Sequence, residues 1–124
     1  MFVSAAMNAG GVPYRAFDRA RTTDRLAMSQ AVFDEVDAVL RRPMLARFVD
    51  PALRAELLDQ LLTGTEWFHP AVRVADCRDP DDNMYLELAL VAQASTIVSG
   101  DQDLLALHPW RGIPIVRPAG YLAG

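Results

Sequence analysis

The chain has 124 residues, of which 52% are hydrophobic and 23% are charged, and this composition is typical of a single globular domain spanning residues 1–124. Its formal net charge of −4 excludes a general electrostatic attraction to nucleic acid, and its single cysteine excludes a disulfide framework. No apolar run reaches the roughly 18 residues of a membrane span, and the first residues lack a secretory signal, so we expect a cytoplasmic protein.

The first third of the chain predicts two strands and two helices. Residues 1–7 have the apolar character of the last part of a buried strand, and a turn signal follows at residues 8–11. Residues 13–21 predict a helix, because proline suits its first position and apolar residues recur on one side. A short strand is expected at residues 25–28, and a second helix at residues 30–41.

The second of these helices begins after Ser29, a suitable cap, and ends before Pro43. Its carboxylates point in different directions on a helical wheel of about 100° per residue. Asp34 lies opposite the apolar stripe, whereas Glu35 and Asp37 flank the stripe on opposite sides. Either Glu35 or Asp37 can therefore lean toward a site beside the core, and the wheel does not choose between them.

The middle of the chain predicts two further helices and a strand. Residues 44–49 predict a short helix, and a longer helix starts at Asp50 and ends at Gly64. The leucines of the longer helix share one face, which is typical of a core position or of a subunit contact. A strand at residues 66–69 and a link at residues 72–74 follow it.

The stretch from residue 78 to residue 107 organises the rest of the chain. Asp79 can cap a helix, Pro80 suits the first helical position, and Asp82 lies where negative charge favours the helix dipole. Residues 84–94 are apolar on nearly every face, so we expect this helix to be buried against a sheet.

A strand at residues 96–99 follows that helix directly, which is the βαβ pattern of a parallel sheet. Ligands of such sheets bind beyond the carboxyl ends of the strands, and Asp101 and Asp103 occupy this position. A short helix, a last strand at residues 113–116 and a final helical turn at residues 118–122 complete the chain.

The acidic residues of this stretch have two explanations. They can serve only as helix caps and dipole partners. Alternatively they converge at one end of the sheet, where unit charges about 5 Å apart repel by roughly 3 kcal/mol per pair at an effective dielectric of about 20. A hard cation such as Mg²⁺ or Mn²⁺ relieves this repulsion and prefers oxygen ligands, so the repulsion favours a cation site.

The remaining polar residues are less specific. All twelve basic residues are arginine, and their clusters fit either phosphate contacts or solvated helix faces. Cys77 has no cysteine partner, and we expect its thiol to be inert. Neither His69 nor His108 has metal-ligand spacing, so we expect surface or packing roles for both.

Three motifs resemble the PIN domain family. The sequence DPDDN at residues 79–83, an apolar helix and SGDQDLL at residues 99–105 resemble the family's acidic motif and its small-Gly-Asp-x-Asp-Leu sequence. SQAVFDEVDAVLRRP at residues 29–43 resembles the helix that carries the family's invariant glutamate, which falls on Glu35. VSAAMNAGG at residues 3–11 is similar to the segment after the family's opening strand.

The resemblance implies an α/β fold, namely a three-layer α/β/α sandwich with a parallel central sheet. It implies a metal-dependent ribonuclease, in which one or two Mg²⁺ or Mn²⁺ ions activate a water, and the toxin of a VapC-like toxin-antitoxin pair. Ser99 would orient the site and Asp79 would act as the cap. The implied partners are an RNA substrate, an antitoxin protein and a second copy of the chain in a homodimer. The implied metal-site acids are Glu35, Asp82, Asp101 and Asp103, of which the first three are catalytic.

One departure from the family concerns the opening strand. The family's first metal-site aspartate lies in an Asp-Thr-Asn motif just before the segment matched here by residues 2–5, and this sequence begins at Met1. Either the start codon was assigned too far downstream, or the protein is truncated or degenerate. We expect the remaining stub to pair weakly or to be covered by a partner subunit, with Asn8 as a possible substitute oxygen ligand.

Two functions follow from these observations. The first is a metal-dependent ribonuclease, and the second is a catalytically silent domain of the same fold that binds RNA or an antitoxin. A receiver-like phospho-acceptor domain is set aside because it needs a late lysine, and the chain contains no lysine.

Overall fold

The computed structural model of the chain describes residues 2–6, 12–43, 47 and 50–123. Its strands are all parallel and form a five-stranded sheet in the order β3-β2-β1-β4-β5. The strands are β1 Phe2–Ala5, β2 Arg25–Met28, β3 Glu66–Trp67, β4 Thr96–Val98 and β5 Ile115–Val116.

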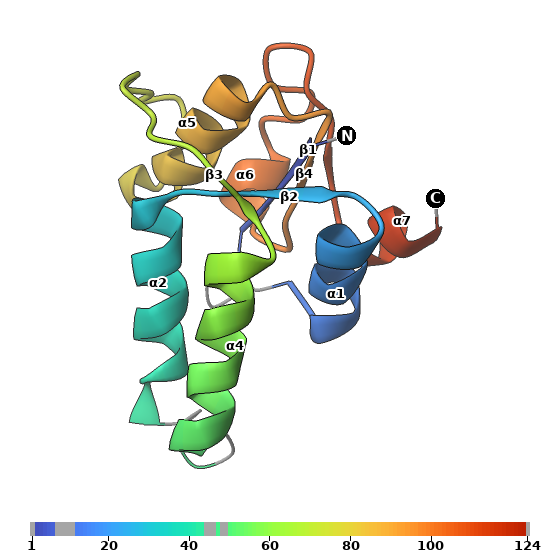
Figure 1. Cartoon of the computed structure of the whole chain (residues 1–124). Helices are drawn as coiled ribbons and strands as arrows, with labels where there is room; N and C mark the ends of the chain where they lie inside the picture. Colours follow the sequence, from blue (N-terminus) through green and yellow to red (C-terminus); the bar gives the residue numbers. More distant parts are fainter. Residues whose placement is uncertain (1, 7–11, 44–46, 48–49, 124) are drawn as a thin grey trace.

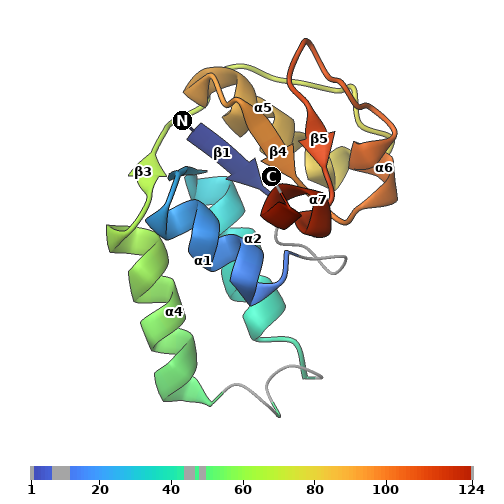
Figure 2. The ribbon, with the colours of Figure 1, turned by 90° about the vertical axis from the view of Figure 1, so that its right-hand side faces the viewer.

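Helices cover both faces of this sheet. Helix α5 packs on β1 and β2, and α1 packs on β2 and α7 from the opposite side (Figures 1 and 2). This arrangement confirms the predicted three-layer α/β/α fold with a parallel central sheet. No helix in the described ranges is long and apolar enough to cross a membrane. The helices are α1 Tyr14–Thr22, α2 Gln30–Leu40, α4 Pro51–Thr63, the 3₁₀ turn η1 Pro80–Asp82, α5 Asn83–Ala92, α6 Gln102–Leu105 and α7 Pro118–Ala123.

The central strand is β1, and the expectation that this segment pairs weakly is wrong. Val3 pairs with Leu26 on one side and with Thr96 on the other, and Ala5 pairs with Val98. Val3 is fully buried and Ala5 nearly so, because helices cover the sheet here on both faces. A four-residue strand therefore joins β2 to β4, although the resemblance placed these residues after the opening strand.

Local signals set most of the helix ends where the sequence predicts them. The Ser29 hydroxyl accepts the N–H of Val32 at the start of α2, and the Asp50 carboxylate accepts the N–H of Leu53 at the start of α4. Gly64 follows the last residue of α4 as predicted. The short helix predicted at residues 44–49 falls largely outside the described residues.

Strands β3 and β5 are each two residues shorter than predicted, and β4 ends one residue early, at Val98. Strand β3 ends at Trp67 rather than at residue 69, and β5 starts at Ile115 rather than at residue 113. Ile113 instead exchanges two backbone hydrogen bonds with Trp110, of 2.8 and 2.9 Å, and closes the turn before β5.

Candidate functional site

The sheet topology brings separate parts of the chain together at the carboxyl ends of the strands. The connection through α1 leads from β1 to β2, whereas β4 lies on the opposite side of β1, so the direction of winding reverses between β1 and β4. Ligands of doubly wound sheets bind at this reversal, beyond the carboxyl ends of the strands. The segments that follow β2 and β4 carry two of the predicted acids, Glu35 and Asp101.

Asp82 lies at the junction of η1 and α5 and is 4% exposed. Asp79 caps the turn before it, as predicted, because its carboxylate accepts the N–H of Asp81 at 3.0 Å. The Asp82 carboxylate does not cap α5. The loop before this junction is tied to it by Asn83, whose side-chain oxygen accepts the N–H of Cys77 at 2.9 Å. Asp82 is therefore a buried acid on a fixed backbone.

Asp101 is fixed by two hydrogen bonds after β4. Its backbone N–H donates to the hydroxyl of the fully buried Ser99 at 3.0 Å. One oxygen of its carboxylate accepts the N–H of Asp103 at 3.1 Å and caps α6. The position of Ser99 in the structure is thus one from which it orients Asp101, and capping uses only one oxygen of the Asp101 carboxylate.

Glu35 and Asp37 differ in their surroundings on α2. The Asp37 carboxylate pairs with the Arg41 guanidinium at 2.9 Å, within the same helix. The Glu35 carboxylate lies 3.8 Å from the guanidinium of Arg42 and is 29% exposed. The charge of Glu35 is among those that raise the pKa of the buried Tyr85, whereas the ion pair of Asp37 stays within α2.

Tyr85 is the residue that sequence reasoning missed. It is fully buried in α5, its carbonyl accepts the Ser4 hydroxyl at 3.3 Å, and its own hydroxyl has no hydrogen-bond partner among the residues that the structure describes. Burial raises the pKa of the Tyr85 hydroxyl most, and the negative charges of Glu35, Asp82 and Asp101 raise it further. Burial and these charges therefore keep the Tyr85 hydroxyl protonated near neutral pH.

Negative charges also affect the pKa of the Cys77 thiol. Burial raises the pKa of Cys77 most, and the charges of Asp82, Asp101 and Asp103 add to this, against a backbone N–H of Asp79 that lowers it. The thiol therefore stays protonated near neutral pH, where it is a weak nucleophile. Asp103 belongs to the same acidic neighbourhood as Asp82 and Asp101.

The predicted site acids do not form a complete metal-binding site among the residues that the structure describes. Among the described residues, no group of three or more His, Cys, Asp or Glu side chains is placed to hold a metal ion. The predicted site acids offer only carboxylate oxygens, and the Tyr85 hydroxyl has no hydrogen-bond partner among the described residues. Such a donor set fits a hard divalent cation such as Mg²⁺ or Mn²⁺. Asn8, considered as a further oxygen ligand, lies outside the described residues.

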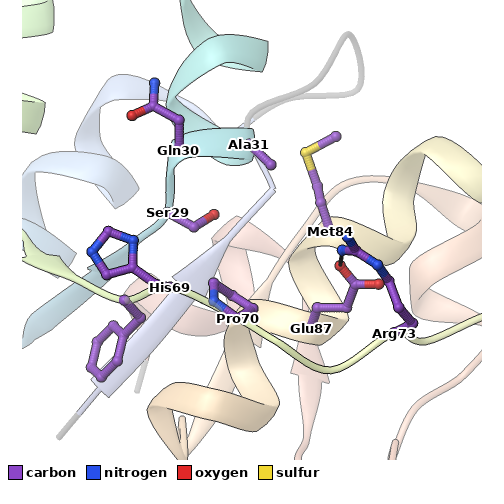
Figure 3. Close-up of a pocket in the computed structure, with 9 residues that line it drawn as sticks. Ser29, Gln30, Ala31, His69, Pro70, Arg73, Met84 and Glu87 are labelled. Carbon is purple, nitrogen blue, oxygen red and sulfur yellow. Dashed lines mark ion pairs between the residues drawn. The ribbon is translucent and has the colours of Figure 1, made fainter.

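A pocket of about 230 Å³ opens at the same end of the sheet, beyond the carboxyl ends of β2 and β3 (Figure 3). One wall is the first turn of α2, a second is the loop after β3, and the third is the face of α5 that carries Met84 and Glu87. Helix α2 also carries Glu35, and α5 starts directly after Asp82. The residues that line the pocket are Ser29, Gln30, Ala31, Phe68, His69, Pro70, Arg73, Met84 and Glu87.

Comparison with known proteins agrees with this arrangement. A family model described as the PIN domain matches residues 1–103, a range that contains β1 to β4 and all the predicted site acids. An uncharacterized protein of Methanocaldococcus jannaschii is 26% identical over 110 residues, which cover 87% of this chain and 70% of that protein. No solved structure matches the chain. With its parallel sheet and a family model that matches most of its length, the chain belongs to the PIN domain family.

Proposed function

We propose that this PIN domain is a metal-dependent ribonuclease and the toxin of a toxin-antitoxin pair, with an antitoxin protein as its partner. PIN domains are typically nucleases, and the family match supports that general activity. The observation that supports the proposal is the topology of a chain that the PIN domain model matches, because Glu35 and Asp101 follow strands β2 and β4 and Asp82 lies at the start of α5. Acids so placed repel one another, and a cation that binds the scissile phosphate would relieve the repulsion.

The residues of the chain have distinct parts in this proposal. Glu35, Asp82, Asp101 and Asp103 would hold Mg²⁺ or Mn²⁺. When bound, such an ion polarises the phosphate and lowers the pKa of a water molecule that attacks it. The hydrogen bond from Asp101 to Ser99 keeps the acidic loop in place, and the protonated Tyr85 hydroxyl offers a hydrogen bond inside the site.

The test is an RNA cleavage assay with Mn²⁺ on three chains. The first is the chain as it stands. The second, called the preceded chain, carries the family's Asp-Thr-Asn motif before its first residue. The third is the preceded chain with Asp82→Asn. We expect the preceded chain to cleave RNA and Asp82→Asn to slow cleavage by about 100-fold or more, because a charge that stabilises the transition state is lost. A preceded chain without activity, or an Asp82→Asn variant with full activity, would refute the proposal.

One observation favours a second candidate, a domain that binds RNA or an antitoxin without cutting. The residues at the carboxyl end of the central strand are Ala5 and Ala6, and both are buried and apolar. In that case calorimetry detects no Mn²⁺ binding by the preceded chain, whereas binding of the partner is retained.

A further inference from the structure

The pocket and the predicted site acids share two helices, α2 and α5. Met84 follows Asp82 by two residues, so their Cα atoms lie at most about 7 Å apart. The first turn of α2 forms another wall, and the same helix carries Glu35. A nucleotide whose phosphate lies at the acids can therefore place a neighbouring group in the pocket.

The size and walls of the pocket suit a single flat ring system. Its volume of about 230 Å³ is below the roughly 300–1,000 Å³ of sites that enclose drug-sized ligands. Ala31, Phe68, Pro70 and Met84 supply apolar surface. The imidazole of His69, an exposed residue, lies near Pro70 (Figure 3). Unpaired bases of single-stranded RNA are bound by stacking on aromatic side chains, among them histidine.

The carboxylate and the hydroxyl of the pocket are both held by hydrogen bonds from backbone N–H groups. The Glu87 carboxylate accepts the N–H of Val74 at 2.9 Å, lies 4.0 Å from the Arg73 guanidinium and is 14% exposed. The Ser29 hydroxyl accepts the N–H of Val32 at 3.3 Å, which leaves its own proton to donate. Figure 3 shows these two groups on opposite walls. The pocket therefore presents a held carboxylate acceptor facing a hydroxyl donor.

A held carboxylate distinguishes between nucleobases. Glutamate accepts hydrogen bonds from the exocyclic amino group of cytosine. Uracil has a carbonyl oxygen in the corresponding place, which a carboxylate repels. The guanidinium of Arg73 is 88% exposed at the rim, where it can contact a phosphate of the same strand.

We infer that this pocket is a subsite for one nucleobase of single-stranded RNA, on a nucleotide adjacent to the one that is cleaved, and that Glu87 selects bases that carry an exocyclic amino group. The inference rests on the proposed ribonuclease function and adds a substrate preference to it.

The first test measures binding in the Asp82→Asn chain, so that cleavage cannot interfere. Fluorescence anisotropy is recorded with short oligonucleotides of cytidine and of uridine, with Glu87→Gln and with Glu66→Gln as the matched control. Glu66 also pairs with an arginine, Arg25 at 3.0 Å, but outside the pocket. We expect a preference for cytidine of about tenfold, lost in Glu87→Gln and kept in Glu66→Gln. Equal binding of the two oligonucleotides, or equal behaviour of the two variants, would overturn the inference.

The second test places the ligand in the pocket directly. Cytidine monophosphate is added to methyl-labelled protein, and we expect the Met84 methyl resonance to shift while that of Ile115, in β5 at the far edge of the sheet, does not. Uridine monophosphate should shift Met84 less at the same concentration. An unmoved Met84 resonance would contradict the inference even where Glu87→Gln weakens RNA binding.

These outcomes separate the inference from the proposed function. If cytidine monophosphate shifts Met84 and Glu87→Gln removes the preference, the base pocket stands even when the preceded chain cleaves nothing. If the preceded chain cleaves RNA but neither pocket measurement responds, only the base pocket fails. If a DNA oligonucleotide of cytosine binds as tightly as the RNA oligonucleotide, the preference for cytosine stands, but the assignment of the pocket to RNA fails.

Discussion

A buried tyrosine hydroxyl among carboxylates is an unusual choice of side chain, because a buried polar group without a partner costs about 1–3 kcal/mol. The ring of Tyr85 fills the core under α5, and phenylalanine would fill the same space without that cost. The hydroxyl therefore serves something other than packing. Because the charges of Glu35, Asp82 and Asp101 raise its pKa, we expect it to serve the proposed metal site.

Tyr85→Phe tests this role. Without divalent ions we expect the variant to be as stable as the original chain, or more stable by up to about 1 kcal/mol, because only a partnerless hydroxyl is removed. We expect its affinity for Mn²⁺ to fall by about tenfold, as when a group that orients metal ligands is lost. Urea unfolding and calorimetry measure the two effects. A clear loss of stability without metal would mean that the hydroxyl already has a structural partner.

Single residues show where sequence reasoning reaches its limit. Asp79 was predictable as a cap because its partner, Asp81, is two residues away. The helical wheel did not choose between Glu35 and Asp37, and only the resemblance to the PIN domain family pointed to Glu35. Tyr85 itself was missed because a tyrosine in an apolar helix has the pattern of an ordinary core residue. A distinguishing signal is its place three residues after Asp82, which puts both on one helix face.

At the scale of elements, α4 illustrates how far a pattern can mislead. Its leucines share one face in sequence, but only Leu61 is buried, at 2% exposure, whereas Leu62 is 53% exposed. Figure 1 shows α4 beside α2, and both extend away from the sheet. The pattern predicted the helix correctly, but the number of buried leucines depends on which other elements reach it.

Adjacent leucines of α4 give a matched pair of variants. We expect Leu61→Ala to lower the free energy of unfolding by about 2–5 kcal/mol, because it leaves a cavity in the core. Leu62→Ala should change it by less than about 0.5 kcal/mol, because the side chain is already largely in water. Urea unfolding monitored by circular dichroism decides the matter, and similar losses for both variants would show that Leu62 is covered in solution.

The elements that were predicted well carry their signals locally. Ser29, Asp50 and Gly64 mark helix ends through bonds to residues within four positions. The ends of strands β3 and β5 and the central place of β1 were not predictable in this way. Each depends on pairing with a strand that is distant in sequence, such as Val3 with Thr96.

For the molecule as a whole, alkaline pH should be destabilising. The pKa values of Tyr85 and Tyr121 are raised above the ordinary value of 10.0, in both cases chiefly by burial and, for Tyr121, also by its hydrogen bond to Asp24. The unfolded chain therefore releases these protons at lower pH than the folded chain. Stability is unaffected below about pH 10 and falls above it, by up to about 1.4 kcal/mol per pH unit for Tyr85.

Unfolding in urea on either side of pH 10 measures this effect. Tyr85→Phe and Tyr121→Phe should each show a shallower loss of stability with rising pH than the original chain. If the slope is the same in all three chains, other groups are responsible for it.

The central strand has a consequence for how the protein is made. Strand β1 is translated before both of its neighbours, and one of them, β4, ends only at Val98. A nascent chain can pair β1 with β2 early, but the other edge of β1 stays open until residues 96–98 have left the ribosome. During that interval the growing chain exposes an apolar edge, and a chaperone or a strand of another nascent chain can bind there.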